Sequence, residues 1–305
     1  MLHRFAVFVA AATALLIFAG GLVTSTDSGL SVPDWPTTYG WFMFTFPLDK
    51  MVGGIRFEHS HRLIASAVGF LIVVLAAWLW RAEPRRWVRR LGYLALAAVV
   101  TQGVLGGITV LWFLPEPISI AHAGLAPLVF CLIVTIALVT SPGWTRGHPS
   151  DDRTLQRVAA ATTTLTYGQM LIGATMRHTG AGLAIPDFPL VFGRLVPPVW
   201  TTPIAMHYAH RLGALAVAAC VLATAGHVLF HHRTRAELRR PAVLLLFVLL
   251  LQLTLGALTV LSGKQYLINS LHVVMGAVVL VTSLVLTLRA YRPRFDAAEP
   301  VQVAA

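Results

Sequence analysis

Long runs of apolar residues, each closed by polar or charged positions, recur along the whole chain. Eight of these runs are long enough to cross a hydrocarbon core of roughly 30 Å, which takes about 20 helical residues. They lie near 5–25, 57–80, 91–113, 119–140, 155–177, 205–230, 242–262 and 267–289. The pattern predicts an all-α integral membrane protein with eight transmembrane helices.

The second half of the chain repeats short motifs of the first half in nearly one register. The segment 28–36, SGLSVPDWP, aligns with 181–189, AGLAIPDFP, at an offset of 153 residues. At offsets of 149 or 150 residues, the matching positions are His61 and His210, Gln102 and Gln252, Gly106 and Gly256, and His122 and His272. Each half holds an even number of spans, so both enter the membrane in the same direction and an axis along the membrane normal should relate them. We therefore expect two parallel, pseudo-two-fold-related four-helix bundles, 1–145 and 155–295, with a cytoplasmic tail at 296–305.

Composition agrees with a lipid environment, because 57% of the residues are hydrophobic and 11% are charged, and the mean hydropathy is +0.75. The formal net charge of +11 comes from arginines that cluster at 81–90, 146–157, 233–240 and 289–294. The charged residues of the opposite loops are mostly acidic: Asp27, Asp34, Asp49 and Asp187 stand against only a few basic residues. The positive-inside rule then places both termini in the cytoplasm of a multi-pass inner-membrane protein, and the charge reflects topology and not nucleic-acid binding.

Four of the 12 histidines lie inside spans at one depth, near the outer end: His61, His122, His210 and His272. Polar residues at membrane depth are costly and usually functional. Haem iron accepts two imidazoles from facing helices, so the spans predict one haem between His61 and His122 and another between His210 and His272. Zinc is the competing metal, but it needs a third protein ligand and no cysteine lies near either pair.

The halves differ three residues before the first histidine of each pair, where Glu58 stands against His207. Both positions share a helix face with the histidine. A carboxyl group beside a haem could move protons during catalysis, and the alternative is a buried ionic partner of a nearby arginine. Arg62 and Arg211 follow the same histidines, where guanidinium groups could pair with haem propionates or snorkel to the interface.

Small residues in two of the spans could let a flat cofactor approach the backbone, and close packing of helices is the alternative explanation. These residues are Gly103, Gly106, Gly107 and Gly256.

The combination of Glu58-x-x-His61-Arg62, His122, His210-Arg211, His272 and the Pro-Asp-Trp-Pro loop resembles the haem A synthase family of bacteria and mitochondria. The resemblance covers the chain from Phe5 to Leu288. It implies an enzyme that oxidises the C8 methyl group of haem O to a formyl group by successive hydroxylations, for cytochrome oxidase biogenesis. It also implies that His210 and His272 hold a permanent haem b, that His61 and His122 are the axial ligands of haem O, and that Glu58 is catalytic.

The resemblance further implies that haem O comes from a haem O synthase and that the electrons leave to an acceptor such as a quinone. Some members carry a cysteine pair in each outer loop, and this chain has no cysteine in 24–55 or 178–205. The best alternative is a dihaem b-type electron-transfer cytochrome, which predicts equivalent halves and does not account for Glu58. A transporter built from two parallel repeats would need a polar path that the spans lack.

Overall fold

The computed structural model describes residues 1–146 and 152–292, and these fold into helices joined by short links and two long loops. The eight long helices are α1 (Leu2–Ser25), α2 (Ile55–Ala82), α3 (Arg86–Leu111), α4 (Glu116–Val139), α6 (Arg153–His178), α7 (Thr202–His231), α8 (Ala236–Leu261) and α9 (Tyr266–Ala290). The shorter elements are α5 (Pro142–Arg146) and the 3₁₀ turns η1 (Met43–Thr45), η2 (Leu48–Lys50) and η3 (Ala181–Leu183). The expected tail, 296–305, lies outside the described residues.

Seven of the described helices are long and apolar enough to cross a membrane, which makes the chain an integral membrane protein. The exception among the long helices is α6, whose sequence carries a run of threonines at 162–164. The hydroxyls of two of them are satisfied inside the protein: Thr162 bonds to Thr224 of α7 (2.8 Å) and Thr163 to Thr287 of α9 (2.9 Å). The helix therefore packs its polar face against other helices.

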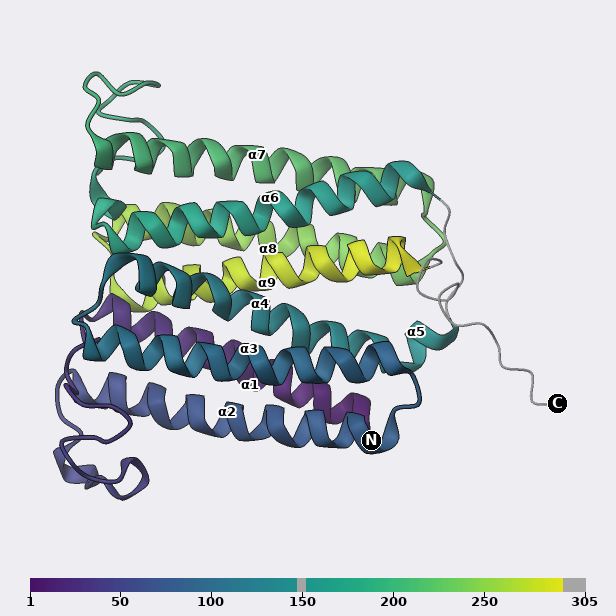
Figure 1. Cartoon of the computed structure of the whole chain (residues 1–305). Helices are drawn as coiled ribbons and strands as arrows, with labels where there is room; N and C mark the ends of the chain where they lie inside the picture. The colour runs from purple at the N-terminus through teal and green to yellow at the C-terminus, as the bar shows by residue number, and fades with distance from the viewer. Residues whose placement is uncertain (147–151, 293–305) are drawn as a thin grey trace.

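Helices α1 to α4 pack on one another around one apolar cluster, and α6 to α9 pack around a second. In Figure 1 the first group lies below and the second above. The two groups meet where α1 and α4 contact α9 and where α4 contacts α6, around Phe130, Ala277 and Val281. The start of α1 and the end of α9 lie at the same end of the molecule (Figure 1).

The two long loops, 26–54 and 179–201, leave the opposite end and share a local structure. In each, an aspartate accepts two backbone N–H groups: Asp34 from Tyr39 (2.7 Å) and Gly40 (2.8 Å), and Asp187 from Phe192 (2.8 Å) and Gly193 (2.9 Å). Burial acts to raise the pKa of Asp34, but the hydrogen bonds from Gly40, Thr37 and Tyr39 outweigh it and lower that pKa. The repeat seen in the sequence therefore extends to the conformation of these loops.

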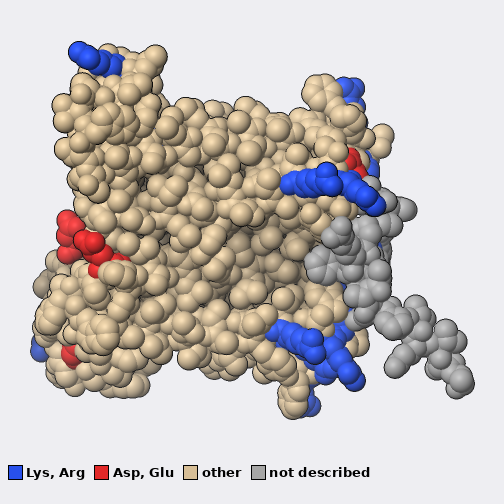
Figure 2. All heavy atoms as spheres, turned by 45° about the horizontal axis from the view of Figure 1, so that its top comes forward, with Lys and Arg blue, Asp and Glu red and all other residues tan. Residues whose placement is uncertain are grey.

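The charged side chains are distributed unequally between the two ends (Figure 2). Lysine and arginine gather mainly where α1 begins and α9 ends. The turn from α2 to α3 carries Arg81 in the last turn of α2, Arg85 in the link and Arg86 at the start of α3. Asp34 and Asp187 lie in the loops at the other end. The apolar middle of the molecule thus separates a basic end from the end that carries the long loops.

Candidate functional site

Each of the four predicted ligand histidines packs its ring on a glycine of a neighbouring helix. A Cβ atom added to Gly20, Gly106, Gly173 or Gly256 would lie 3.1, 3.1, 2.9 or 3.0 Å from Cε1 of His61, His122, His210 or His272, respectively. The four contacts join α1 to α2, α3 to α4, α6 to α7 and α8 to α9. Each half of the protein therefore contains two imidazoles that lie in the space left by glycines, and we call such a pair with its two glycines an imidazole cradle.

Within each half, the two imidazoles lie close enough to interact electrostatically, His61 with His122 and His210 with His272. Surrounding protein desolvates all four, yet each side chain keeps some accessible surface. Partly buried imidazoles in an apolar surround are suited to hold a ligand between them. Each half thus holds two such imidazoles, and their role as a pair of iron ligands stays a prediction.

Glutamines support three of these histidines. The Gln102 side-chain amide donates to the backbone carbonyl of His122 (2.9 Å), and Nδ1 of His122 bonds to the Gln102 backbone carbonyl (3.2 Å). The equivalent Gln252 places its amide nitrogen 3.5 Å from Nε2 of His272. Gln169 of α6 contacts His210. Nδ1 of His122 donates to the Gln102 carbonyl, which fixes the orientation and the tautomer of that ring and leaves its Nε2 for a metal. Nδ1 of His61 and Nδ1 of His272 have no hydrogen-bond partner among the described residues.

Glu58 and His207 are both buried, with 3% and 2% exposure, and they hold the loop of their own half. Oε2 of Glu58 accepts the Val32 N–H (2.8 Å), and Nδ1 of His207 accepts the Ile185 N–H (3.3 Å). Oε1 of Glu58 also accepts from Arg62 (2.6 Å). The carboxylate and the imidazole thus perform the same loop contact, while only the first half places an acid there.

Arg62 and Arg211 also contact the loops. Arg62 donates to the backbone carbonyls of Asp34 (2.7 Å), Thr37 (3.0 Å) and Val32 (2.9 Å). Arg211 donates to those of Leu190 (2.8 Å), Ile185 (3.1 Å) and Asp187 (2.7 Å). Both guanidinium groups therefore anchor loops over the histidines, and contact with haem propionates stays a prediction.

The glycines of α3 differ in what they face. Gly106 carries the His122 ring, and a Cβ on Gly107 would lie 2.6 Å from the Trp35 ring of the loop, whereas nothing lies within 4 Å of Gly103. The sequence groups all three as lining for a flat cofactor. Gly106 therefore contacts a predicted ligand histidine, Gly107 contacts the loop, and Gly103 contacts neither.

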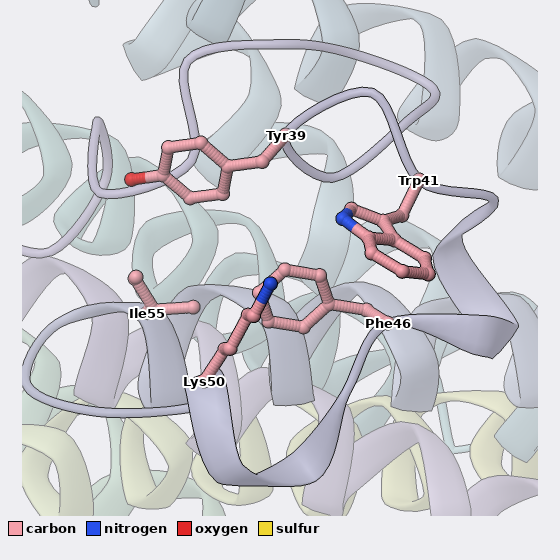
Figure 3. A pocket seen from close by; sticks show the side chains of 5 residues that line it. All are labelled: Tyr39, Trp41, Phe46, Lys50 and Ile55. Atoms are coloured by element: carbon pink, nitrogen blue, oxygen red, sulfur yellow. The ribbon is translucent and has the colours of Figure 1, made fainter.

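His59 belongs to this region although the sequence pattern gave no reason to select it. It is 1% exposed, its Nδ1 bonds to the Thr38 hydroxyl (3.0 Å), and its ring lies 5.0 Å from that of Phe46. Phe46 also lines a hollow of about 290 Å³ between the loop and the start of α2, with Tyr39, Trp41, Lys50 and Ile55 (Figure 3). A side-chain contact inside a folded loop has no signal in a single sequence.

A group of three potential metal ligands occurs among the described residues at the basic end, remote from the cradles. The Asp152 carboxylate accepts from Nε2 of His227 (2.7 Å) and of His232 (2.9 Å), and the three ligand atoms lie within 4.8 Å of one another. Both histidines lie at the end of the molecule opposite the long loops and pair with Asp152. Among the described residues, no such three-ligand group includes His61, His122, His210 or His272.

Comparisons with known proteins agree with this geometry. A curated protein of Symbiobacterium thermophilum named "Heme A synthase" is 33% identical over 277 residues, covering 85% of this chain and 87% of that protein. Proteins of the same name from Geobacillus kaustophilus and an Exiguobacterium strain are 28% and 29% identical, over 87% and 88% of this chain and 84% and 86% of theirs. The profile of the COX15-CtaA family, described as "Cytochrome oxidase assembly protein", matches residues 3–285. With two imidazole cradles inside a membrane bundle and a match over nearly its whole length, the chain belongs to the COX15-CtaA family of cytochrome oxidase assembly proteins.

Proposed function

We propose that this protein is a haem A synthase, an oxidoreductase that converts the C8 methyl group of haem O into the formyl group of haem A for cytochrome oxidase biogenesis. The observation that carries the proposal is the pair of matched histidine cradles, of which only one has a carboxylate beside it. Relatives named for this activity match along most of the chain. Two cradles of one design suit two haems, and one unmatched acid suits a reaction at one of them.

In this proposal, His61 and His122 would hold the iron of the substrate haem O, and His210 and His272 would hold the iron of a resident haem b. Haem fits these residues, since glycines leave room for each imidazole ring and Nδ1 of His122 is engaged by a carbonyl. Neutral imidazoles held in this way offer Nε2 to iron. When bound, haem b supplies one-electron redox chemistry.

The chain positions the substrate and handles protons. In each of two steps a C–H bond of the methyl group breaks and a C–O bond forms with oxygen from water, releasing two protons and passing two electrons to an acceptor such as a quinone. The first step gives the alcohol and the second the gem-diol, which loses water to the aldehyde. Glu58 is the group that would take the proton leaving the hydroxyl of the oxidised substrate carbon. Its orientation is fixed because Val32 and Arg62 already donate to its two oxygens, and the buried loop over it excludes water.

We further propose that α6 is an eighth membrane span and that the protein comprises two parallel four-helix halves, 1–145 and 155–295, related by a pseudo-two-fold axis along the membrane normal. The packing of α6 between α4, α7 and α9 supports this, since its hydroxyls find partners there. The basic end then faces the cytoplasm with both termini, and the haem sites lie toward the outer side. The partners of the bilayer-embedded enzyme are a haem O synthase as the source of substrate and an electron acceptor such as a quinone.

The decisive experiment is to express the protein with and without a haem O supply and to identify the extracted haems by mass. Haem A should appear only with haem O present. A dihaem electron-transfer cytochrome would yield protein-bound haem without haem A, and that result would contradict the proposal. Replacing His210 or His272 with Leu should remove or alter a low-spin b-type spectrum, and an unchanged spectrum in both variants would refute the ligand assignment.

Glu58→Gln tests the proton-transfer role. The amide keeps the size of the side chain and can still accept one hydrogen bond, but it cannot take up a proton. We expect the rate of haem A formation to fall by roughly 10²–10⁴, with the haem b spectrum intact because His210 and His272 lie in the other half. The matched control is His207→Gln, which changes the equivalent loop contact in the second half. Haem A formation by Glu58→Gln at the parental rate and equal protein level would make the carboxylate a loop anchor only.

A further inference from the structure

We propose that Asp152, His227 and His232 form a binding site for a divalent transition-metal ion, with Zn²⁺ as the best match, and that the bound ion clips the start of α6 to the end of α7. The site lies at the basic end of the molecule, whereas His210 lies near the start of α7. It is independent of the proposed haem chemistry, because none of its residues belongs to an imidazole cradle.

The three side chains converge from two helices. Asp152 directly precedes α6, His227 lies near the end of α7, and His232 follows the last residue of that helix. Nε2 of His227 and Nε2 of His232 lie 2.7 and 2.9 Å from the same carboxylate oxygen, Oδ2 of Asp152. Ligand atoms on a tetrahedral zinc lie about 3.3 Å apart, since each is about 2.0–2.1 Å from the ion. The two rings therefore need to move outward by only roughly half an ångström to admit an ion.

The donor set selects the class of ion. Two imidazoles and one carboxylate suit zinc and the other divalent first-row transition metals, whereas Ca²⁺ and Mg²⁺ prefer oxygen ligands. Three protein ligands leave one position of a tetrahedral zinc for water. Burial acts to raise the pKa of Asp152, but the hydrogen bonds from His227, Leu155 and His232 outweigh it and lower that pKa. The carboxylate is therefore in the charged form that binds a metal.

Neighbouring groups already orient the ligands. The other carboxylate oxygen of Asp152, Oδ1, accepts the Leu155 N–H (2.9 Å) and so caps α6. The His227 ring stacks on the His231 ring, with the ring centroids 4.4 Å apart. Nδ1 of His227 and Nδ1 of His232 have no hydrogen-bond partner among the described residues, so each ring can carry its proton there while Nε2 binds the ion. Ligands that are held in place before the ion arrives bind it more tightly.

A link at this position matters for α6, which hydropathy alone does not identify as a membrane span among the described helices. Polar contacts such as that of Thr162 with Thr224 (2.8 Å) hold it against α7. An ion at Asp152 adds a second fixed point at the start of the helix. Because the ion binds only when both helices are in place, it stabilises their packing.

The test is a metal titration of the full-length protein as purified, after adventitious metal has been removed with EDTA. Bound Zn²⁺ is measured by mass spectrometry after equilibrium dialysis, and Zn²⁺ bound elsewhere cancels in the comparison of parent and variants. Partners of metal ligands are each worth about 10–100-fold in metal affinity, so His227→Ala and His232→Ala should weaken binding at this site by at least that factor. Asp152→Asn should also weaken it while keeping a side chain that caps α6.

Thermal unfolding provides the second measurement. Zn²⁺ should raise the unfolding temperature of the parent, and it should have little effect on the three variants. Mg²⁺ should have no effect on any of them. In metal-free buffer the variants should differ little from the parent, because partly exposed ion pairs contribute little to stability.

The matched control is His3→Ala. His3 is a histidine near the same end, its Nδ1 bonds to the Ala137 carbonyl (2.8 Å), and it has no carboxylate partner among the described residues; this variant should bind Zn²⁺ as the parent does. Equal Zn²⁺ affinity in the parent and all three triad variants would overturn the proposal and leave a hydrogen-bonded cluster. An equal loss in His3→Ala would also overturn it, since binding would then be spread over surface histidines. The titration does not depend on haem A formation, so failure of the proposed activity leaves its result unchanged.

Discussion

The imidazole cradles predict that one added methyl group on α6 should weaken haem binding while leaving the fold intact. In Gly173→Ala, the new Cβ would lie 2.9 Å from Cε1 of His210. Carbon atoms in van der Waals contact lie at about 3.5–4.0 Å, so the ring must move by roughly half an ångström or more. Such a movement displaces Nε2 from the position where it would meet iron.

The cost follows from the packing. Overfilling a packed site typically costs about 1–3 kcal/mol, and each 1.4 kcal/mol corresponds to about a tenfold change in affinity. We therefore expect Gly173→Ala to weaken haem b binding at the His210–His272 site by about 5–150-fold. The helix itself should not suffer, because alanine in a helix interior is favoured over glycine by about 1 kcal/mol.

The assay is a haem titration of purified protein carrying His61→Leu, followed by Soret absorbance, with thermal unfolding measured in parallel. Gly168→Ala is the control, since the same substitution five residues earlier on α6 meets nothing within 4 Å. That control should bind haem as the parent does. Equal haem affinity of Gly173→Ala and Gly168→Ala would refute the cradle, and with it the argument that these glycines exist to seat the histidines.

Three further predictions concern the loops and the basic end. Gly107→Ala should displace the Trp35 ring, which lies 2.6 Å from the added Cβ, and should raise the rate of proteolysis in the first loop; an unchanged rate would contradict that contact. The pKa of Asp34 is lowered, so the protection from proteolysis that its carboxylate gives this loop should be constant from pH 8 down to about pH 4, the ordinary pKa of an aspartate, and should disappear below it. The measurement compares the proteolysis rates of the parent and Asp34→Asn, and loss of the difference between them near pH 6 would contradict this. Asp152→Asn keeps a helix-capping side chain but removes the charge beside His227, so unfolding should be easier by only about 0.2–1 kcal/mol, measured by thermal unfolding, and a much larger loss would indicate a different role.

Much of the fold could be predicted from the sequence, because apolar runs of membrane-spanning length and a repeat in one register are properties of the chain itself. The family and the histidine pairs followed from the same repeat. The hydrophobic pattern was least informative for α6, because Thr162 and Thr163 lower the hydropathy of this helix. Only the packing of the helices shows which groups their hydroxyls bond to.

The glycines show why the rest could not be predicted. The sequence pointed to Gly103, Gly106, Gly107 and Gly256 as small residues near a cofactor, but only Gly106 and Gly256 seat a histidine. Gly20 and Gly173 seat the other two, and no local pattern marks them. Which side of a helix meets a neighbour depends on the rotation of both helices in the bundle, and a single sequence does not contain that rotation.

The differences between the halves concentrate on one side of two equivalent helices. Positions 58, 61 and 64 of α2 are spaced by three residues and lie along one face, and they read Glu, His and Ile; positions 207, 210 and 213 of α7 read His, His and Gly. The histidine, its glycine cradle and the following arginine are retained in both halves, so binding and loop anchoring need them. The residues on either side of this histidine differ, so one half has an acid three residues before His61, while the other has Gln169 against His210 in the space left by Gly213. Divergence beside a matched ligand is what a duplicated binding site requires if only one copy is to react with the haem that it holds.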